Sequence, residues 1–151
     1  MSAVYFHVDV NSAYLSWTAA YRTLVDGSSL DLREIPSVIG GDENSRHGIV
    51  LAKSLPAGRL GIRTGEPLAL ARRRVPNLLV LPPDYGLYAE CSRSLMDLLS
   101  QYSPEVFQYS IDEAFADMSQ TTRLFGSPLT AADTIRRRVR EELGFTVNIG
   151  I

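Results

Sequence analysis

In the segment Tyr109-Ser-Ile-Asp-Glu-Ala-Phe-Ala-Asp117, two adjacent acids separate two short apolar segments. Residues 107–111 alternate apolar and polar side chains before the acids, and residues 114–117 read as a returning strand. Alternation of period two is typical of a half-buried strand, so the stretch predicts a β-hairpin. Asp112 and Glu113 would then lie at or near the hairpin tip.

A strand with the same alternation opens the chain. Val4, Phe6 and Val8 fall on one of its faces, and Asp9 stands at its end. Apolar residues then recur at helical spacing over residues 13–24. The chain is therefore expected to begin with a strand followed by a helix.

Two further helices flank the hairpin. Apolar spacing predicts one helix over residues 84–102, and Thr130-Ala-Ala-Asp133 matches the capping box of another, which Gly144 ends. A last strand covers residues 145–151. Leaving out residues 35–83, the order is strand, helix, hairpin, helix, strand, with one additional helix before the hairpin. This order predicts an α+β fold with a ferredoxin-like split βαβ sheet, antiparallel and covered by helices on one face.

The omitted segment reads as a small insertion. Residues 37–39 and 48–52 have the composition of short strands, and residues 68–74 predict a helix. Glycines and prolines divide the rest into short elements.

Asp9, Asp112 and Glu113 are the sharpest candidates for chemistry. If the first strand lies beside the hairpin, the three carboxylates converge at one edge of the sheet. Like charges repel in a partly buried site, so the group requires protons or cations. Mg²⁺ prefers carboxylate oxygens, and two ions about 4 Å apart would support an in-line phosphoryl displacement. His7 and His47 are too isolated to suggest a zinc site.

The 151-residue chain has a globular composition, with 45% apolar residues, 21% charged residues and a net charge of −2. It shows no membrane-spanning run, no signal peptide and a single cysteine, Cys91, so we expect a cytoplasmic protein with no membrane partner. Residues 51–76 carry six basic groups and one acidic group, whereas residues 77–120 carry one and seven. We expect the first segment to favour anions and the second to favour cations.

Three motifs resemble the N-terminal part of the Y-family translesion DNA polymerases, the DinB/UmuC/ImpB group. They are Asp9-Val-Asn-Ser-Ala-Tyr14, Gly48-Ile-Val-Leu-Ala52 and the stretch from Tyr109 to Asp117. The resemblance implies a palm subdomain from residues 1–12 and 80–151, interrupted by a small fingers subdomain over residues 13–79. It also implies DNA repair by translesion synthesis, in which a nucleotide passes from a dNTP to a primer 3′ hydroxyl opposite damaged template.

The same resemblance implies roles for single residues. Asp9 and Asp112 would hold both Mg²⁺ ions, and Glu113 would hold the ion nearest the primer hydroxyl. The backbone carbonyl of Val10 would complete a ligand shell. Tyr14 falls where the family places its steric gate, a ring that leaves no space for a ribose 2′-hydroxyl.

The match fails at the triphosphate grip. Where the family commonly has a Tyr and an Arg, this chain has Leu55 and Gly58, neither of which can donate a side-chain hydrogen bond. Arg59 or Lys53 is the available substitute, since phosphate binding requires charge-assisted donors.

The resemblance extends to partners. Ile49 and Leu51 would form the roof over the nascent base pair, with primer-template DNA and a dNTP as substrates. We expect that the family's thumb and little-finger domains are absent, and that such a fragment has little polymerase activity and weak DNA binding on its own. A sliding clamp would bind through the absent regions. The terminal strand over residues 145–151 would offer an edge for a dimer.

Two alternatives stay open. Gly40-Gly41-Asp42-Glu43-Asn44 is similar to the hairpin of diguanylate cyclases, but Asn44 replaces an aromatic residue, so we interpret the segment as a turn. A nucleotidyl cyclase-like palm would need Asp42 and Glu43 beside the end of the first strand. A non-catalytic accessory subunit that keeps the fold would fit the altered grip at Leu55 and Gly58.

Overall fold

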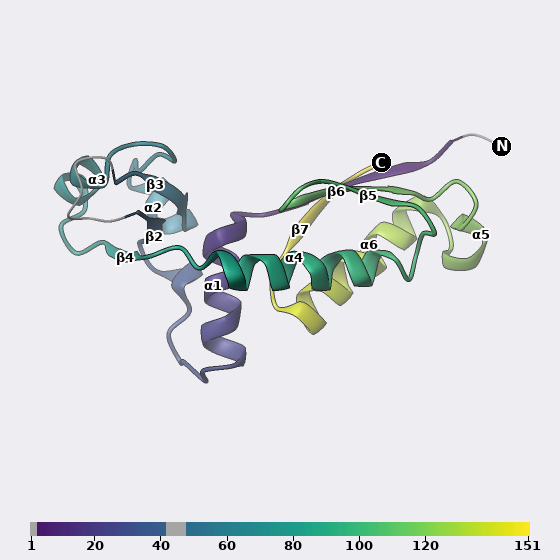
Figure 1. Ribbon diagram of the computed structural model, residues 1–151, viewed down its shortest axis with the longest axis horizontal. Helices are drawn as coiled ribbons and strands as arrows, with labels where there is room; N and C mark the ends of the chain where they lie inside the picture. Colours follow the sequence, from purple (N-terminus) through teal and green to yellow (C-terminus); the bar gives the residue numbers. More distant parts are fainter. Residues whose placement is uncertain (1–2, 42–47) are drawn as a thin grey trace. The chain divides into compact units, whose positions relative to one another are not determined.

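Both ends of the chain build the first of two units. The computed structural model describes residues 3–41 and 48–151. Residues 1–11 and 86–151 form the first unit, and residues 12–85 form the second (Figure 1).

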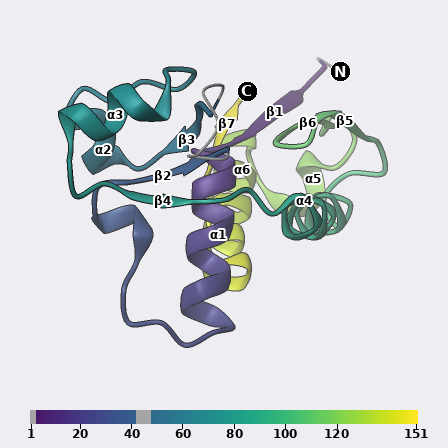
Figure 2. The same ribbon diagram turned by 60° about the vertical axis from the view of Figure 1, so that its left-hand side comes forward.

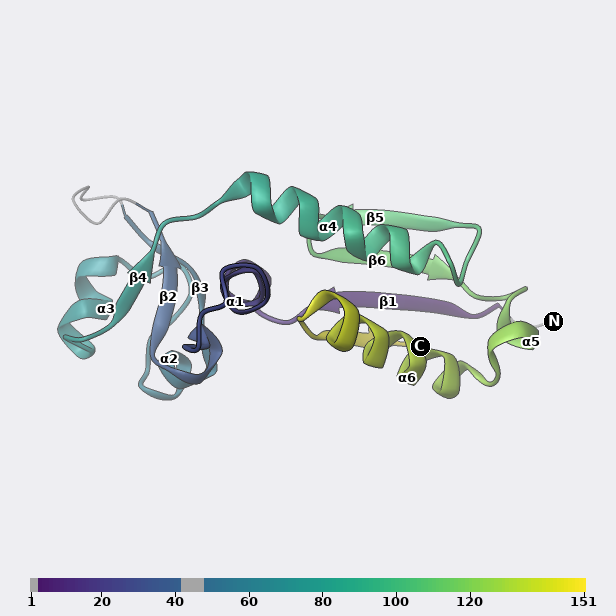
Figure 3. The ribbon, with the colours of Figure 1, turned by 90° about the horizontal axis from the view of Figure 1, so that it is seen from below.

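The first unit contains a four-stranded antiparallel sheet in the order β5-β6-β1-β7. Its strands are β1 (Tyr5–Val10), β5 (Val106–Ser110), β6 (Glu113–Asp117) and β7 (Val147–Gly150). The helices α4 (Tyr85–Leu99) and α6 (Pro128–Arg138) cover one face of this sheet (Figure 3). The predicted ferredoxin-like topology is therefore confirmed, with the hairpin in the predicted place.

The period-two alternation of β1 divides the sheet into a buried and an open face. Phe6, Val8 and Val10 are at most 3% exposed, because they point toward the helices. His7 and Asp9 alternate with them and are half-buried on the opposite face. Burial of the apolar series thus fixes which face presents the polar groups.

Helix α6 begins earlier than the sequence predicted. Ser127 is its N-cap, with its hydroxyl accepting from the Thr130 backbone N–H at 3.2 Å, and Pro128 follows at the first helical position. The expected capping box at Thr130 was wrong, because Ser127-Pro128 supplies a stronger start signal. A π-helical turn, η2 (Val139–Leu143), continues the helix to Gly144, whose φ of 83° ends it as predicted. A short helix, α5 (Thr122–Phe125), precedes α6.

The second unit contains a three-stranded sheet in the order β3-β2-β4. Its strands are β2 (Ser37–Gly40), β3 (Val50–Lys53) and β4 (Leu79–Leu81). The helix α1 (Ala13–Leu24) packs on one face through Leu15, whereas α2 (Leu55–Arg59) and α3 (Leu68–Arg74) pack on the other (Figure 2). A 3₁₀ turn, η1 (Leu32–Glu34), leads into β2.

The strand β4 corrects the predicted boundary between the units. It pairs in parallel with β2, so residues 80–85 belong with the second unit rather than with the first. Residue 12 also belongs to the second unit. The sequence analysis missed this strand because a three-residue run carries too little periodicity.

The predicted turn over residues 40–44 is only partly covered. Gly40 ends β2, and Gly41 donates its N–H to the Ile49 carbonyl at 3.3 Å. Residues 42–44 lie outside the described part of the chain. Within residues 3–41 and 48–151, no helix is both long enough and apolar enough to cross a lipid bilayer.

Candidate active site

The predicted acids meet where β1 ends and β6 begins. Asp9 and Glu113 are register partners across the antiparallel β1–β6 ladder. The backbone N–H of Val10 donates to the carbonyl of Asp112 at 2.9 Å, which ties the hairpin tip to the end of β1. The backbone juxtaposition predicted from the sequence is thus present.

Two neutral or weakly basic side chains hold the acidic pair at the hairpin tip. The Ser110 hydroxyl lies 2.8 Å from Oδ1 of Asp112 and 3.1 Å from Oε2 of Glu113. Nε2 of His7 lies 3.2 Å from the other oxygen of Glu113. Glu113 is therefore oriented by contacts on both carboxylate oxygens.

The electrostatics of Asp9 show crowding by like charges. Partial burial raises the pKa of the Asp9 carboxyl above its ordinary value, and the neighbouring charges of Asp112 and Glu113 raise the pKa further. His7 opposes this pKa shift. A cation beside these groups would relieve the repulsion.

The donor chemistry of this edge fits a divalent cation such as Mg²⁺, which prefers carboxylate and carbonyl oxygens. The side chains are not gathered around one point, however. In the part of the chain that the structure describes, no three acid, histidine or cysteine side chains are grouped closely enough to hold a metal ion. Since Glu113 contacts both His7 and Ser110, its engagement with a metal would require exchanging one of these contacts.

His7 and Ser110 were not predicted as members of this site. Each stands two residues before a candidate acid, His7 before Asp9 and Ser110 before Asp112. Residues two apart on a strand share a face, so the spacing of His7 and Asp9 on β1 was a usable signal. Ser110 ends β5 and Asp112 lies in the following turn, so no such signal linked them.

A second polar group adjoins the acids on the other side of β1. Asn148 on β7 is the register partner of Asp9. Its amide nitrogen donates to Oδ1 of Asn11 at 2.8 Å, and the amide of Asn11 donates to the Thr146 hydroxyl at 2.9 Å. These bonds tie the end of β1 to the beginning of β7, and the sequence analysis did not anticipate them.

The predicted sugar and base contacts lie in the second unit. Tyr14 and Leu51 pack against the same small cluster, which includes Leu15 and Ile39. The Tyr14 ring also meets the Tyr85 ring edge-on, with centroids 6.0 Å apart. Tyr14 is therefore held in a packed aromatic environment on α1.

The other predicted roof residue is less enclosed. Ile49 is 39% exposed and forms an isolated bridge with Pro67 ahead of β3. Leu51, by contrast, is half-buried. The two side chains thus differ in how firmly they are packed.

The residues at the predicted triphosphate grip have different surroundings. The ammonium of Lys53 donates to the Ile62 carbonyl at 3.1 Å, and its stem lies against Gly58. Arg59 is exposed at the end of α2. Leu55 opens that helix with 71% of its surface exposed. Arg59 is consequently the more available cation of the two.

Solved structures of known proteins have the same fold as this chain. The crystal structure of DinB from Sulfolobus solfataricus superposes with a TM-score of 0.80 at 23% identity, covering 97% of this chain and 41% of that one. An insertion ternary complex of Dbh DNA polymerase gives 0.81 at 22% identity, with the same coverage. The two units have the fold of the palm and fingers of Y-family DNA polymerases.

Comparison with related sequences identifies the family of the chain. The profile of the impB/mucB/samB family matches residues 8–151, and the chain belongs to this family. It is 54% identical over its whole length to DNA polymerase IV of Clostridium acetobutylicum, and 38% identical to that of Alkaliphilus oremlandii. The chain spans 38% and 36% of the lengths of these relatives.

Proposed function

We propose that the chain is the palm and fingers part of a translesion DNA polymerase. Its reaction would be template-directed nucleotidyl transfer from a dNTP to a primer 3′ hydroxyl opposite damaged DNA. The observation that carries this proposal is the register pairing of Asp9 with Glu113. The hydrogen bond from the Val10 backbone N–H to the Asp112 carbonyl accompanies it. The pairing supports the proposal because it joins Asp9 to the hairpin that carries Asp112 and Glu113.

The proposal assigns Mg²⁺ binding to this edge. Asp9 and Asp112 would hold two ions, the Val10 carbonyl would add an oxygen ligand, and Glu113 would serve the ion nearest the primer hydroxyl. Bound Mg²⁺ would supply charge stabilisation for phosphoryl transfer. Ser110 would orient Asp112 and Glu113 through its hydroxyl.

The second unit would select the nucleotide. Tyr14 would exclude the 2′-hydroxyl of a ribonucleotide, because a fixed ring leaves no room for the extra oxygen. Ile49 and Leu51 would cover the nascent base pair, and Arg59 or Lys53 would bind the triphosphate. Primer-template DNA is the implied partner. A sliding clamp, and a dimer through the edge strand β7, complete the proposed partners.

A non-catalytic accessory role is the second candidate. Leu55 and Gly58 favour it, because neither offers a side-chain donor where phosphate binding would need one. A cyclase-like site has less support, because β6 and β7 already occupy both sides of β1. Asp42 and Glu43 lie outside the described residues.

The test is primer extension by a chimera. Residues 1–151 would replace the matching segment of the Clostridium acetobutylicum relative, and extension would be measured with Mg²⁺, dNTPs and a lesion-bearing template. We expect the chimera without further substitutions to extend the primer. Asp112→Asn should lower the extension rate by at least about a thousandfold, whereas the exposed control Asp97→Asn should keep the rate. A folded native chimera that binds DNA without extending the primer would support the accessory role instead.

A further inference from the structure

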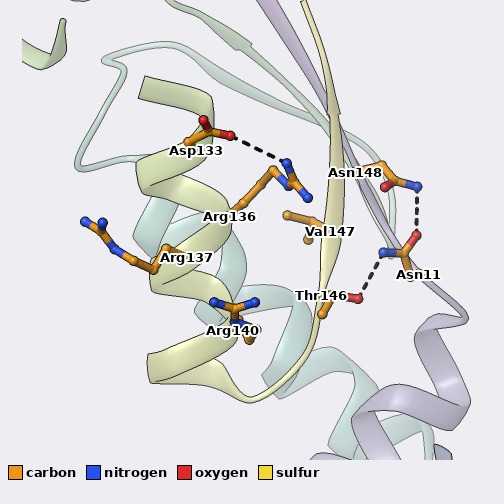
Figure 4. A pocket seen from close by; sticks show the side chains of 8 residues that line it. All are labelled: Asn11, Asp133, Arg136, Arg137, Arg140, Thr146, Val147 and Asn148. Atoms are coloured by element: carbon orange, nitrogen blue, oxygen red, sulfur yellow. Dashed lines mark hydrogen bonds and ion pairs between the residues drawn. The ribbon is translucent and has the colours of Figure 1, made fainter. Parts of the chain in front are cut away.

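A basic groove beside β7 is separate from the proposed metal ligands. It has a volume of about 530 Å³ and is formed by α6, η2, the beginning of β7 and the end of β1 (Figure 4). The residues that line it are Asn11, Asp133, Arg136, Arg137, Arg140, Thr146, Val147 and Asn148. Three guanidinium groups and one carboxylate give this lining a net charge of +2. Its size is that of a small-ligand site.

The arginines of the groove come from two consecutive helical segments. Arg136 and Arg137 come from the last turn of α6, and Arg140 comes from the π-helical turn η2 that follows it. Ile135 and Val139, which precede Arg136 and Arg140 in the sequence, are fully buried and anchor these two segments. Arg136 extends toward β7, whereas Arg137 extends away from the strand and lies at the rim (Figure 4).

These arginines are weakly engaged compared with others in the chain. Arg136 has one long ion pair with Asp133, at 3.5 Å, and both side chains are mostly exposed. Such exposed pairs contribute little to stability, so Arg136 can exchange its partner at low cost. By contrast, the guanidinium of Arg138, which points elsewhere, binds Glu142, Gln101 and Tyr102. The groove therefore presents cations that the fold itself does not require.

The opposite wall supplies neutral hydrogen-bonding groups. Asn148 donates one amide hydrogen to Asn11, and an amide nitrogen carries two. The Thr146 side chain also lies on this wall (Figure 4). A phosphate group, with several acceptor oxygens, can bind an arginine fork and an amide at once. A carboxylate has only two oxygens, which a single arginine fork uses.

We propose that this groove binds a run of phosphate groups, either of a nucleic-acid backbone or of a free polyphosphate. Arg136 and Arg140 would each hold a different phosphate, with Arg137 adding attraction at the rim and Asn148 a neutral donor. This binding uses no metal and none of the three candidate carboxylates. It is therefore independent of the proposed polymerase activity.

The test measures binding by the 151-residue chain in EDTA, so that no metal-bridged contact contributes. A short fluorescein-labelled oligothymidine reports backbone binding by anisotropy, and unlabelled tripolyphosphate and polyglutamate serve as competitors. The test variant is Arg136→Gln/Arg140→Gln. The matched control is Arg93→Gln/Arg123→Gln, which removes the same charge from two exposed positions of the same unit.

We expect the test variant to bind the oligonucleotide about tenfold more weakly, and its slope of log affinity against log salt to fall by about 1.4. The control should change affinity less than about twofold. Competition by tripolyphosphate would identify free polyphosphate as a ligand, and its absence would identify the backbone. Equal loss in both variants, no loss in either, or displacement of the oligonucleotide by polyglutamate would overturn the proposal. Thermal unfolding of each variant checks that the fold is intact.

Discussion

Asp9 and Glu113 face each other across the β1–β6 ladder, although 104 positions separate them in the sequence. The pairing sets two carboxylates side by side on the open face of the sheet, with Asp112 next to them at the hairpin tip. Close like charges oppose folding unless a cation or a proton intervenes. The site is therefore expected to lower stability when it contains neither.

Asp9→Asn should raise the free energy of unfolding at pH 7 in EDTA and low salt. The pKa of the Asp9 carboxyl is raised in the fold, so its favourable contribution is complete below the ordinary value of 3.8 and is lost as pH rises through the raised pKa. The gain should be on the order of a few tenths of a kcal/mol, because the site is partly solvated and screened. Urea denaturation between pH 3 and pH 7 checks this, and an Asn variant less stable than the native chain at pH 7 would contradict it.

Mg²⁺ should make the native chain more stable than Asp9→Asn, which is the reverse of their order in EDTA. Millimolar Mg²⁺ is expected to raise the melting temperature of the native chain more than that of Asp9→Asn, since ligands that bind the folded state stabilise it. Differential scanning fluorimetry measures the shift. Equal shifts in the two proteins would show that Asp9 does not hold the ion.

Ser110→Ala should lower stability by about 1 kcal/mol and weaken Mg²⁺ binding, because its hydroxyl contacts both Asp112 and Glu113. The measurements are urea denaturation and a Mg²⁺ titration of the melting temperature. Ser100→Ala is the matched control, since that exposed hydroxyl donates to the Met96 carbonyl of the preceding helix, α4. A similar loss of Mg²⁺ binding in both variants would argue against a positioning role for Ser110.

Tyr14→Ala in the chimera should raise ribonucleotide use relative to deoxynucleotide use by at least about tenfold, because the ring would no longer meet the 2′-hydroxyl. Tyr14→Phe keeps the ring and should keep the discrimination. Alkaline cleavage of the extension products measures incorporated ribonucleotides. An equal fall in the use of both nucleotide types by Tyr14→Ala would indicate lost packing with Leu15, Ile39 and Tyr85 rather than a gate.

Cys91 should react slowly with iodoacetamide. Burial, aided by the charge of Glu90, raises the pKa of its thiol to about 11, so the reactive thiolate is scarce at neutral pH. The alkylation rate should rise about tenfold per pH unit from pH 7 to pH 9.5 without a plateau. Free glutathione, which levels off near its own pKa of about 8.5, is the control. A plateau for Cys91 in this range would disprove the shift.

Local sequence patterns were enough to predict the order and type of most elements. These patterns are the alternation in β1 and in the hairpin, and the apolar stripes of α4 and α6. Each is local, and each is present in the fold because burying its apolar side stabilises the element directly. The candidate acids could also be proposed from the sequence, since each stands at the end of a strand. The three-residue strand β4 and the Ser127 cap were not predicted, because short elements depend on a partner or a competing start signal.

Which side chains contact one another depends on how the strands and helices pack. The register that pairs Asp9 with Glu113 and Asn148 depends on strands far apart in the chain, and a slip of one residue would move all three to other partners. Likewise, the contacts of His7 and Ser110 with Glu113, and the gathering of Arg136 and Arg140 beside β7, follow from packing rather than local pattern. Long-range contacts of this kind are selected by the fold as a whole, because no single segment contains both partners.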